Sequence, residues 1–314
     1  MKYVKYALKR LVQMVLILLL ATFVVFCIIR ISNVDEVSII GSAKHMTDEV
    51  RASITAEYHL DESIPKQYLR WISGVLTGDL GKDYKYQTSV VSMILPRIPV
   101  TLGLLSFSML FTIVISLPLG ILCAVRKNTP FDTAASVITL IFTAVPEFVL
   151  SLIALILVSK LFPSYSFVGS WSGAAEYLKR ILLPSAVLSA ECVAFIMRIT
   201  RSNMIGQLDS NYITTAKAKG MSQFNIVITH AFHNGCLPVL TILITMIGTT
   251  ISSTILVEQI FSLSGIGTLL VESVQTYNYP VTQVLMLILL GIFMLLSYIV
   301  DLLYTILDPR IELT

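Results

Sequence analysis

Six long stretches of apolar residues run through this sequence and limit its fold more than any other feature does. A helix needs about 20 residues to cross the hydrocarbon core of a bilayer, and each stretch is close to or above that length. Lipid offers no hydrogen-bond partner to backbone groups, so each spanning segment has to be helical. We therefore predict an all-α membrane protein whose six transmembrane helices cover residues 9–30, 99–124, 134–159, 181–198, 236–260 and 281–307.

The composition supports this interpretation. Charged residues make up 13% of the chain and hydrophobic residues 55%, and the mean hydropathy is +0.82, whereas soluble domains carry about 25% charged residues. The first apolar run follows Lys2, Lys5, Lys9 and Arg10, as a signal peptide would, but no small-residue cleavage pattern comes after it. We expect this run to be retained as the first span.

The basic residues predict the orientation of the spans, because short cytoplasmic loops are enriched in lysine and arginine. With the N-terminus in the cytoplasm, the inner segments carry eleven basic residues against four acidic ones. We therefore expect both termini to be cytoplasmic. The inner basic residues are Lys2, Lys5, Lys9, Arg10, Arg126, Lys127, Arg198, Arg201, Lys217, Lys219 and Arg310.

This arrangement divides the chain into three parts. Residues 1–30 form a cytoplasmic start and the first span, residues 31–98 form an extracellular segment, and residues 99–314 form a core of five spans. The extracellular segment should consist of short helices and turns, because helical periodicity around Tyr68 and Trp71 ends in a glycine-rich stop.

A basic, amphipathic segment of the core, about residues 199–235, lies between the fourth and fifth spans on the cytoplasmic side. Gly220 interrupts it, as a helix end or a close backbone approach requires. The stretch TTAKAKG has small side chains that permit close docking against a partner protein, and its lysines can meet carboxylates there. The same lysines suit contact with anionic lipid. The residues alone leave both partners open.

Two carboxylates lie well inside the predicted spans, where ionisable side chains usually face a protein interior or a cavity. Glu147 follows Pro146, which we expect to kink the third span, and Glu191 lies in the fourth. These carboxylates either line a translocation path and attract a cationic group, or they form structural hydrogen bonds between helices. Glu258 and Asp301 lie near span ends, and we interpret both as solvated at the membrane interface.

The sequence contains no catalytic constellation and no phosphate-binding loop of the GxxxxGK[ST] kind. His230 and His233 share a helix face, but we predict a polar surface there and no metal site. We expect no catalytic residue, no metal and no cofactor in this chain.

Several separated motifs in this chain together resemble one family. The stretch YITTAKAKGMSQFNIVITHAFHNGCLPVL is similar to the coupling segment of ABC importer permeases, and most closely to the first permease subunit of the oligopeptide/dipeptide/nickel family. Further matches occur in the same order along the chain: YHLDESIPKQYLRW, GDLGKDY, LPRIPVTLGL, MRITRSNM, VEQIFSLSGIGTLLVESVQTYNYPV and LDPRIE. One departure stands out, because the family pattern of glutamate, alanine, alanine reads Thr214, Thr215, Ala216 here.

The resemblance implies a role for the basic segment and a set of partners. The segment would insert into a groove of a cytoplasmic ATPase through Tyr212, Thr214, Thr215, Ala216, Lys217, Ala218, Lys219, Gly220 and Met221. The partners would be a second homologous permease subunit, two ABC ATPase subunits that bind ATP and Mg, an extracellular substrate-binding protein and the lipid bilayer, with no nucleic acid. The stretch after the fifth span would be a re-entrant or surface helix; an ordinary connector is the alternative.

The expected function is that of a transmembrane subunit in the bacterial plasma (inner) membrane, forming half of a path for peptides in an ATP-driven importer. The same kind of importer carrying nickel or a metal–chelator complex is the first alternative. A secondary transporter or channel driven by an ion gradient is an alternative from another class; it would favour inverted repeats, and we find no internal repeat in the sequence.

Overall fold

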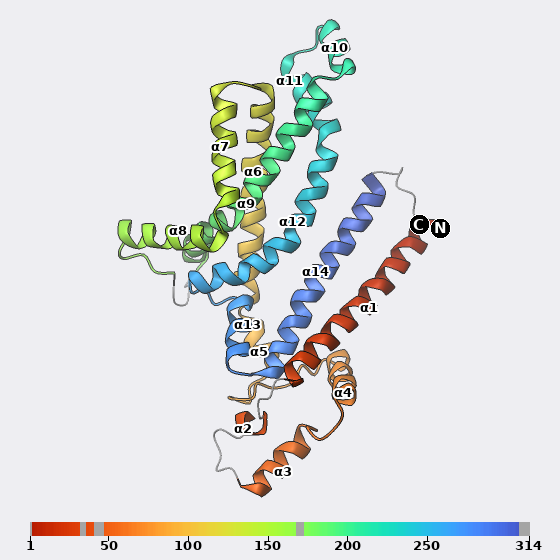
Figure 1. Cartoon of the computed structure of the whole chain (residues 1–314), viewed down its shortest axis with the longest axis vertical. Helices are drawn as coiled ribbons and strands as arrows, with labels where there is room; N and C mark the ends of the chain where they lie inside the picture. The colour runs from red at the N-terminus through yellow and green to blue at the C-terminus, as the bar shows by residue number, and fades with distance from the viewer. Residues whose placement is uncertain (1, 32–35, 41–46, 168–172, 308–314) are drawn as a thin grey trace. The chain divides into compact units, whose positions relative to one another are not determined.

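The computed structural model describes residues 2–31, 36–40, 47–167 and 173–307 (Figure 1). Helices dominate this part of the chain, and the only β-type contact in it is an isolated bridge between Lys82 and Ser89. The predicted all-α class is therefore confirmed. Arg310, with Asp308 and Glu312, falls outside the described residues.

The described helices include five that are long and apolar enough to cross a membrane, and a bent pair that brings the number to six if it counts as one span. The five are Tyr6–Ile31, Ile98–Val125, Ala174–Leu208, Pro238–Ile260 and Tyr279–Ile299, and the bent pair is Pro130–Ala144 with Glu147–Leu161. These helices match the six apolar stretches of the sequence.

The third stretch is not the single helix that we predicted for residues 134–159. It forms α7 (Pro130–Ala144) and α8 (Glu147–Leu161), which meet at an angle of 102°. The cause is Pro146, which lacks an N–H and forces the preceding residue out of helical geometry. Val145 is accordingly extended, with φ −87° and ψ 121°. The expected kink is thus confirmed, and it is sharp enough to break the helix.

The fourth stretch is longer than predicted. Residues 181–198 belong to α9 (Ala174–Leu208), which has 35 residues. The apolar pattern did not predict its full length, because polar residues occur near both ends of the helix. Near the first end, Arg180 pairs with Glu176 one turn earlier, with 2.7 Å between Nη2 and Oε1. The helix also continues beyond Arg198 into the segment that we expected to be a cytoplasmic connection.

The chain divides into two compact units, and we describe each by itself. The first contains Met1–Pro99 and Ser264–Tyr298; the second contains Val100–Leu263 and Ile299–Thr314. Unit 1 includes α1 (Lys2–Ile31), α2 (Glu36–Ile40), α3 (Asp48–Glu57), α4 (Ile64–Thr77), α5 (Val90–Ile94), α13 (Ile266–Gln275) and most of α14 (Tyr279–Leu307). In the described part of residues 31–98, α2 to α5 are short helices joined by turns.

In unit 1, α4 packs on α1 through aromatic side chains. The ring of Tyr68 contacts those of Phe23 and Phe26 edge to face, with centroids 5.1 and 5.5 Å apart, and its hydroxyl lies 2.9 Å from that of Thr22. The helix ends at Gly78, whose φ of +87° suits glycine. The apolar side chains along the rest of α1 are largely exposed, as lipid contact requires.

In unit 2, α9 is the central helix and packs against α7, α8 and α12 (His233–Ile260). It approaches α6 (Ile98–Val125) so closely at Gly120 that a Cβ there would lie 2.6 Å from Thr200 Cβ. Figure 1 shows α7 running beside α9, and α8 turning sharply from the direction of α7. Helices α8, α9 and α12 contact one another in pairs.

Candidate functional site

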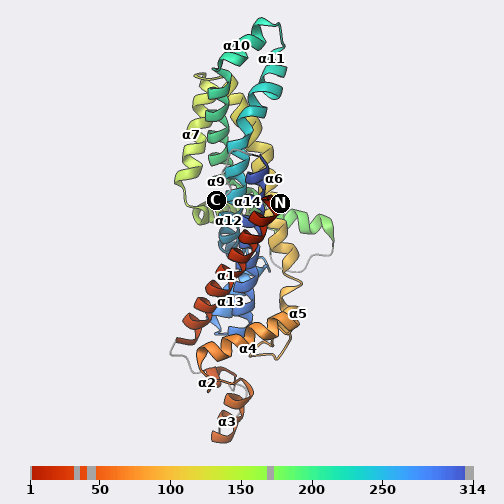
Figure 2. The same cartoon turned by 90° about the vertical axis from the view of Figure 1, so that its right-hand side faces the viewer.

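The basic segment forms a short surface helix with a defined end. Helix α10 (Asn211–Ala218) lies at one end of unit 2, together with α11 (Gln223–Asn225) (Figures 1 and 2). Gly220 has a φ of +75°; its amide donates to the carbonyl of Lys217, and that of Met221 donates to the carbonyl of Ala216. This pair of bonds is a Schellman motif, in which the left-handed position favours glycine. Gly220 therefore fixes how the chain leaves α10.

Helix α10 has one face turned into the protein and one turned out. Ile213 and Ala216 are buried in an apolar cluster with Met204 of α9 and Ala124 of α6, and Met221 packs against that cluster. The other seven residues of the expected coupling set are exposed: Tyr212, Thr214, Thr215, Lys217, Ala218, Lys219 and Gly220. Ala216 thus holds the helix in place, and the exposed face remains available to a partner.

Phe224 belongs to the apolar residues that make the 199–235 segment amphipathic, and it is exposed. Its exposed fraction is 74%, and that of Tyr212 in the same segment is 39%. The apolar periodicity could not separate it from its neighbours Ile226 and Val227, which are buried. A phenylalanine held this far out, beside the exposed face of α10, is suited to contact another surface.

The segment continues into α12 without a break. Residues Ile226–Phe232 form a π-helix, η1, that begins directly after α11 and runs into α12 at His233. Such wide turns occur often at functional sites. His230 lies within it, and its Nε2 atom is buried without a hydrogen-bond partner among the described residues.

The two carboxylates predicted at membrane depth line one cavity of unit 2. Glu147, at the start of α8, and Glu191, in the middle of α9, border a cavity of about 490 Å³ whose third wall is α12. We call it the α12 cavity. Its other lining residues are Leu188, Cys192, Phe195, Thr241, Ile242, Thr245, Met246, Thr249, Thr250 and Ser253. The sequence suggested each carboxylate separately, and the break at Pro146 brings Glu147 to this cavity.

Glu258 corrects a sequence-based interpretation. We expected this residue to be solvated at a span end, but its exposed fraction is 0%. The hydroxyl of Thr101 in α6 donates to Glu258 Oε1 at 2.5 Å, which ties α6 to α12. The side chain of Asp301, interpreted in the same way, lies outside the described residues.

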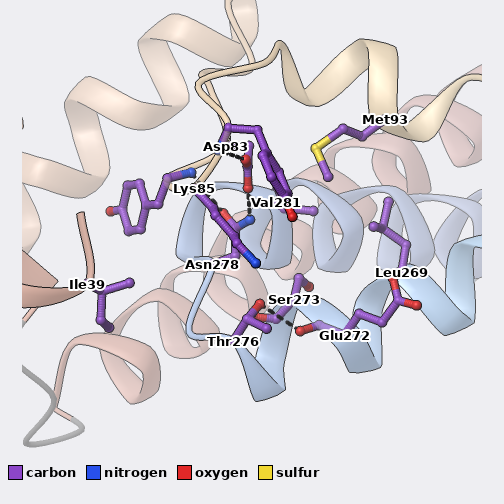
Figure 3. Close-up of a pocket in the computed structure, with 12 residues that line it drawn as sticks. Ile39, Asp83, Lys85, Met93, Leu269, Glu272, Ser273, Thr276, Asn278 and Val281 are labelled. Atoms are coloured by element: carbon purple, nitrogen blue, oxygen red, sulfur yellow. Dashed lines mark hydrogen bonds between the residues drawn. The ribbon is translucent and has the colours of Figure 1, made fainter. Parts of the chain in front are cut away.

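A second cavity, of about 400 Å³, lies in unit 1 between residues of the 31–98 segment and α13 (Figure 3). Asn278 donates to the buried Asp83, whose carboxylate also accepts the amide of Tyr86. Glu272 pairs with Arg97, with 3.6 Å between the carboxylate and Nη2. Lys85 lines the same cavity. The stretch after the fifth span is therefore a helix that meets the 31–98 segment.

Burial governs the acid–base chemistry of one group beside this second cavity. Tyr84 is buried, and removal from water raises the pKa of its phenol above the usual range; its hydrogen bond to Glu36, at 3.3 Å, acts in the same direction. The phenol therefore stays protonated and donates to Glu36. No group of three or more His, Cys, Asp or Glu side chains suited to a metal ion occurs in the described residues.

These features define a class: an α-helical membrane protein with several spans, a membrane-depth cavity lined by carboxylates and an exposed surface helix. Comparison with known proteins narrows the class to a family. Residues 116–313 match the family of binding-protein-dependent transport system inner membrane components, and residues 3–105 match the N-terminal region of such components. The chain belongs to this family, which confirms the resemblance drawn from the motifs.

Three relatives illustrate the match. A probable peptide ABC transporter permease of Sinorhizobium fredii is 30% identical over 310 residues, covering 98% of this chain and 99% of the relative. A putative peptide transport system permease of Brucella abortus is 32% identical over 308 residues, covering 97% and 98%. The dipeptide transport system permease DppB of Escherichia coli is 32% identical over 317 residues, covering 93% and 94%. All three align with the chain nearly end to end.

Proposed function

We propose that this chain is a transmembrane subunit of an ATP-driven peptide importer and forms half of its translocation path. The observation that carries the proposal is membership of the binding-protein-dependent transport family along nearly the whole chain, with relatives named for peptide transport. The subunit would lie in the bacterial inner membrane with both termini in the cytoplasm. Its partners would be a second homologous permease, two ABC ATPases that bind ATP and Mg, and an external substrate-binding protein.

The exposed face of α10 supports coupling to the ATPases. The helix is anchored through Ile213 and Ala216, so a force applied to its outer face reaches the ends of α6 and α9. Lys217 and Lys219 would place positive charge against an acidic groove of the ATPase. Thr214 stands where the family pattern has glutamate, so its contact with an ATPase would be a hydroxyl hydrogen bond.

Replacement of Gly220 by valine tests this coupling. The left-handed backbone at Gly220 costs about 1–3 kcal/mol for another residue, and a β-branched side chain is especially unsuited to it. No other atom lies within 4 Å of an added Cβ, so the change acts on the end of α10 without a clash. ATPase subunits that co-purify with the complex should decrease severalfold, and peptide-dependent ATP hydrolysis should decrease with them.

Gly206→Ala is the matched control, because Gly206 lies in regular helix α9 and an added Cβ there meets no atom within 4 Å. The control should keep both ATPase binding and hydrolysis. The coupling assignment is wrong if Gly220→Val reaches the membrane in normal amount and retains the ATPases at the level of Gly206→Ala.

The α12 cavity supports a place for Glu147 and Glu191 on the translocation path. Replacing both by glutamine removes two negative charges and keeps the side-chain size. A hydrogen bond to a charged group contributes about 1.5–3 kcal/mol, so uptake of peptide by the reconstituted complex should fall by about tenfold or more. Unchanged uptake with both residues replaced would exclude them from the path.

The cavity of unit 1 supports an external partner. Residues of the 31–98 segment and α13 together line this partly open cavity, with the charged side chains Lys85 and Glu272 at its wall. Such a surface suits the docking of a substrate-binding protein.

We prefer peptide to nickel or a metal chelate as the transported substrate, because the relatives described above are named for peptides.

A further inference from the structure

We propose that the α12 cavity recognises a protonated amino group, such as the free amino terminus of a peptide, and excludes its carboxylate end. This inference rests on the proposed function and names the part of the substrate that the path recognises. Three observations carry it: the hydroxyl stripe on α12, the two carboxylates opposite it, and the lack of any basic side chain among the residues that line the cavity.

The hydroxyl stripe consists of Thr241, Thr245, Thr249 and Ser253. These positions are spaced by four residues, so they lie above one another on one face of a helix. The hydroxyl of Thr245 donates to the carbonyl of Thr241 at 3.0 Å, and that of Thr249 donates to the carbonyl of Met246 at 2.9 Å. Because the protons of Thr245 and Thr249 are used within the helix, these two hydroxyl oxygens are left to act as acceptors toward the cavity.

The carboxylates opposite the stripe are also acceptors when they are ionised. Glu147 Oε1 is buried and has no hydrogen-bond partner among the described residues. Glu191 is exposed in this isolated chain although it lies in the middle of α9. Ser253 lies near Glu147 and interacts with its carboxylate. Ser253 thus satisfies part of the Glu147 carboxylate, and Oε1 is left without a partner.

An ammonium group is the ligand that completes this arrangement. It carries three donors and no acceptor, so it can bond a carboxylate and neighbouring hydroxyl oxygens at the same time. A carboxylate in the same position would meet two like charges and no cation. The remaining wall, formed by Leu188, Phe195, Ile242 and Met246, is apolar and suits the side chain of a first residue. The cavity therefore fits the amino end of a peptide.

The charge in the cavity can be tested with a thiol introduced by Thr245→Cys, because Thr245 lines the cavity and is exposed. In the assembled complex, the four native cysteines would be replaced so that the introduced cysteine is the one reactive thiol. Its reaction rates with aminoethyl methanethiosulfonate, a cation, and sulfonatoethyl methanethiosulfonate, an anion, would each be divided by the rate of a free thiol. A cleft lined by one sign of charge raises the local concentration of counter-ions by about 10-fold to 1,000-fold.

We expect the cation to react at least about tenfold faster than the anion, in line with this concentration effect. The ratio should fall toward one when Glu147→Gln and Glu191→Gln are combined. Glu49→Gln, the same change on the exposed surface of α3, should leave it unchanged. Equal rates in the unmodified cavity, failure of both reagents to react, or a ratio that the paired change does not alter would overturn the proposal.

A transport measurement tests the recognition step itself. Two peptides that the binding protein holds with equal affinity, one with a free amino terminus and one N-acetylated, would be compared in proteoliposomes containing the full complex. The free peptide should be imported at least severalfold faster, and Glu147→Gln with Glu191→Gln should bring the two rates together. Equal rates before substitution would overturn the proposal. A complex that imports neither peptide, while the thiol introduced by Thr245→Cys still prefers the cation, would contradict the proposed peptide transport and leave the charge of the cavity established.

Discussion

Replacing Phe224 by alanine is expected to release most of the ATPase from the complex while the permease itself remains folded. The ring is 74% exposed, so its removal leaves no cavity in the chain. Aromatic residues that insert into a partner commonly contribute about 2 kcal/mol or more to binding, which corresponds to a loss of about 30-fold in affinity. The measurement is titration of the purified ATPase onto the permease in detergent or nanodiscs, read as binding and as stimulated hydrolysis.

Gln223→Ala is the matched control, because Gln223 is the exposed neighbour of Phe224 in the same short helix. It should change the affinity by less than a factor of about three, since most interface residues contribute little. If the two variants bind the ATPase equally well, Phe224 does not contact that partner. Reduced membrane abundance of Phe224→Ala with normal ATPase affinity would instead assign the ring to lipid.

Replacing Arg201 by alanine is expected to cause the largest loss of stability in unit 2. Arg201 of α9 donates to both carboxylate oxygens of Asp132 in α7, at 2.5 and 2.7 Å, and the amide of Asn128 donates to the same carboxylate at 3.0 Å. Asp132 is only 3% exposed. Removing Arg201 leaves the buried carboxylate with the Asn128 amide but without a counter-charge, at a cost of up to about 3–5 kcal/mol. Thermal unfolding of the purified protein should occur on the order of 10 °C lower.

Three further variants make this result specific. Arg201→Lys keeps the charge but cannot form the two parallel bonds, so its loss should be intermediate. Adding Asp132→Ala to Arg201→Ala should recover part of the stability, because the uncompensated charge is then gone. Lys127→Ala removes an exposed pair with Asp209, 3.2 Å long, and should cost at most about 1 kcal/mol. A loss no greater for Arg201→Ala than for Lys127→Ala would show that the pair does not hold α7 to α9.

The spans could be predicted from sequence because the length of each apolar run is visible in the sequence. The apolar runs do not show where a helix continues through polar residues. The ends of α9 carry Arg180 and Arg201, whose charges are satisfied by Glu176 and Asp132. Charge counting treated Arg201 and Asp132 as independent loop residues, although they form one pair. A local sequence pattern cannot identify ion-pair partners that lie far apart in the sequence.

The same limitation explains the residues of the site. Glu147 and Glu191 were conspicuous because carboxylates are rare at membrane depth, yet their meeting in one cavity depends on the break at Pro146. Glu258 was misread because its distance along the chain from the end of a span says nothing about burial, and its partner Thr101 lies on another helix. Phe224 could not be distinguished from the buried Ile226 and Val227, because helical periodicity does not extend reliably across Gly220 and the short turn that follows.

The unbroken helical run from Gln223 through η1 to Ile260 has a mechanical consequence. The exposed ring at Phe224 and the first hydroxyl of the stripe at Thr241 belong to the same continuous helical run, which includes η1 and Pro238, and are separated along it by roughly 25 Å at 1.5 Å per residue. A tilt of about 5° at one end of a rod of that length displaces the other end by about 2 Å. The surface that would meet the ATPase and the wall of the α12 cavity are thus joined by one continuous stretch of helix, so a movement of one can reach the other along the backbone.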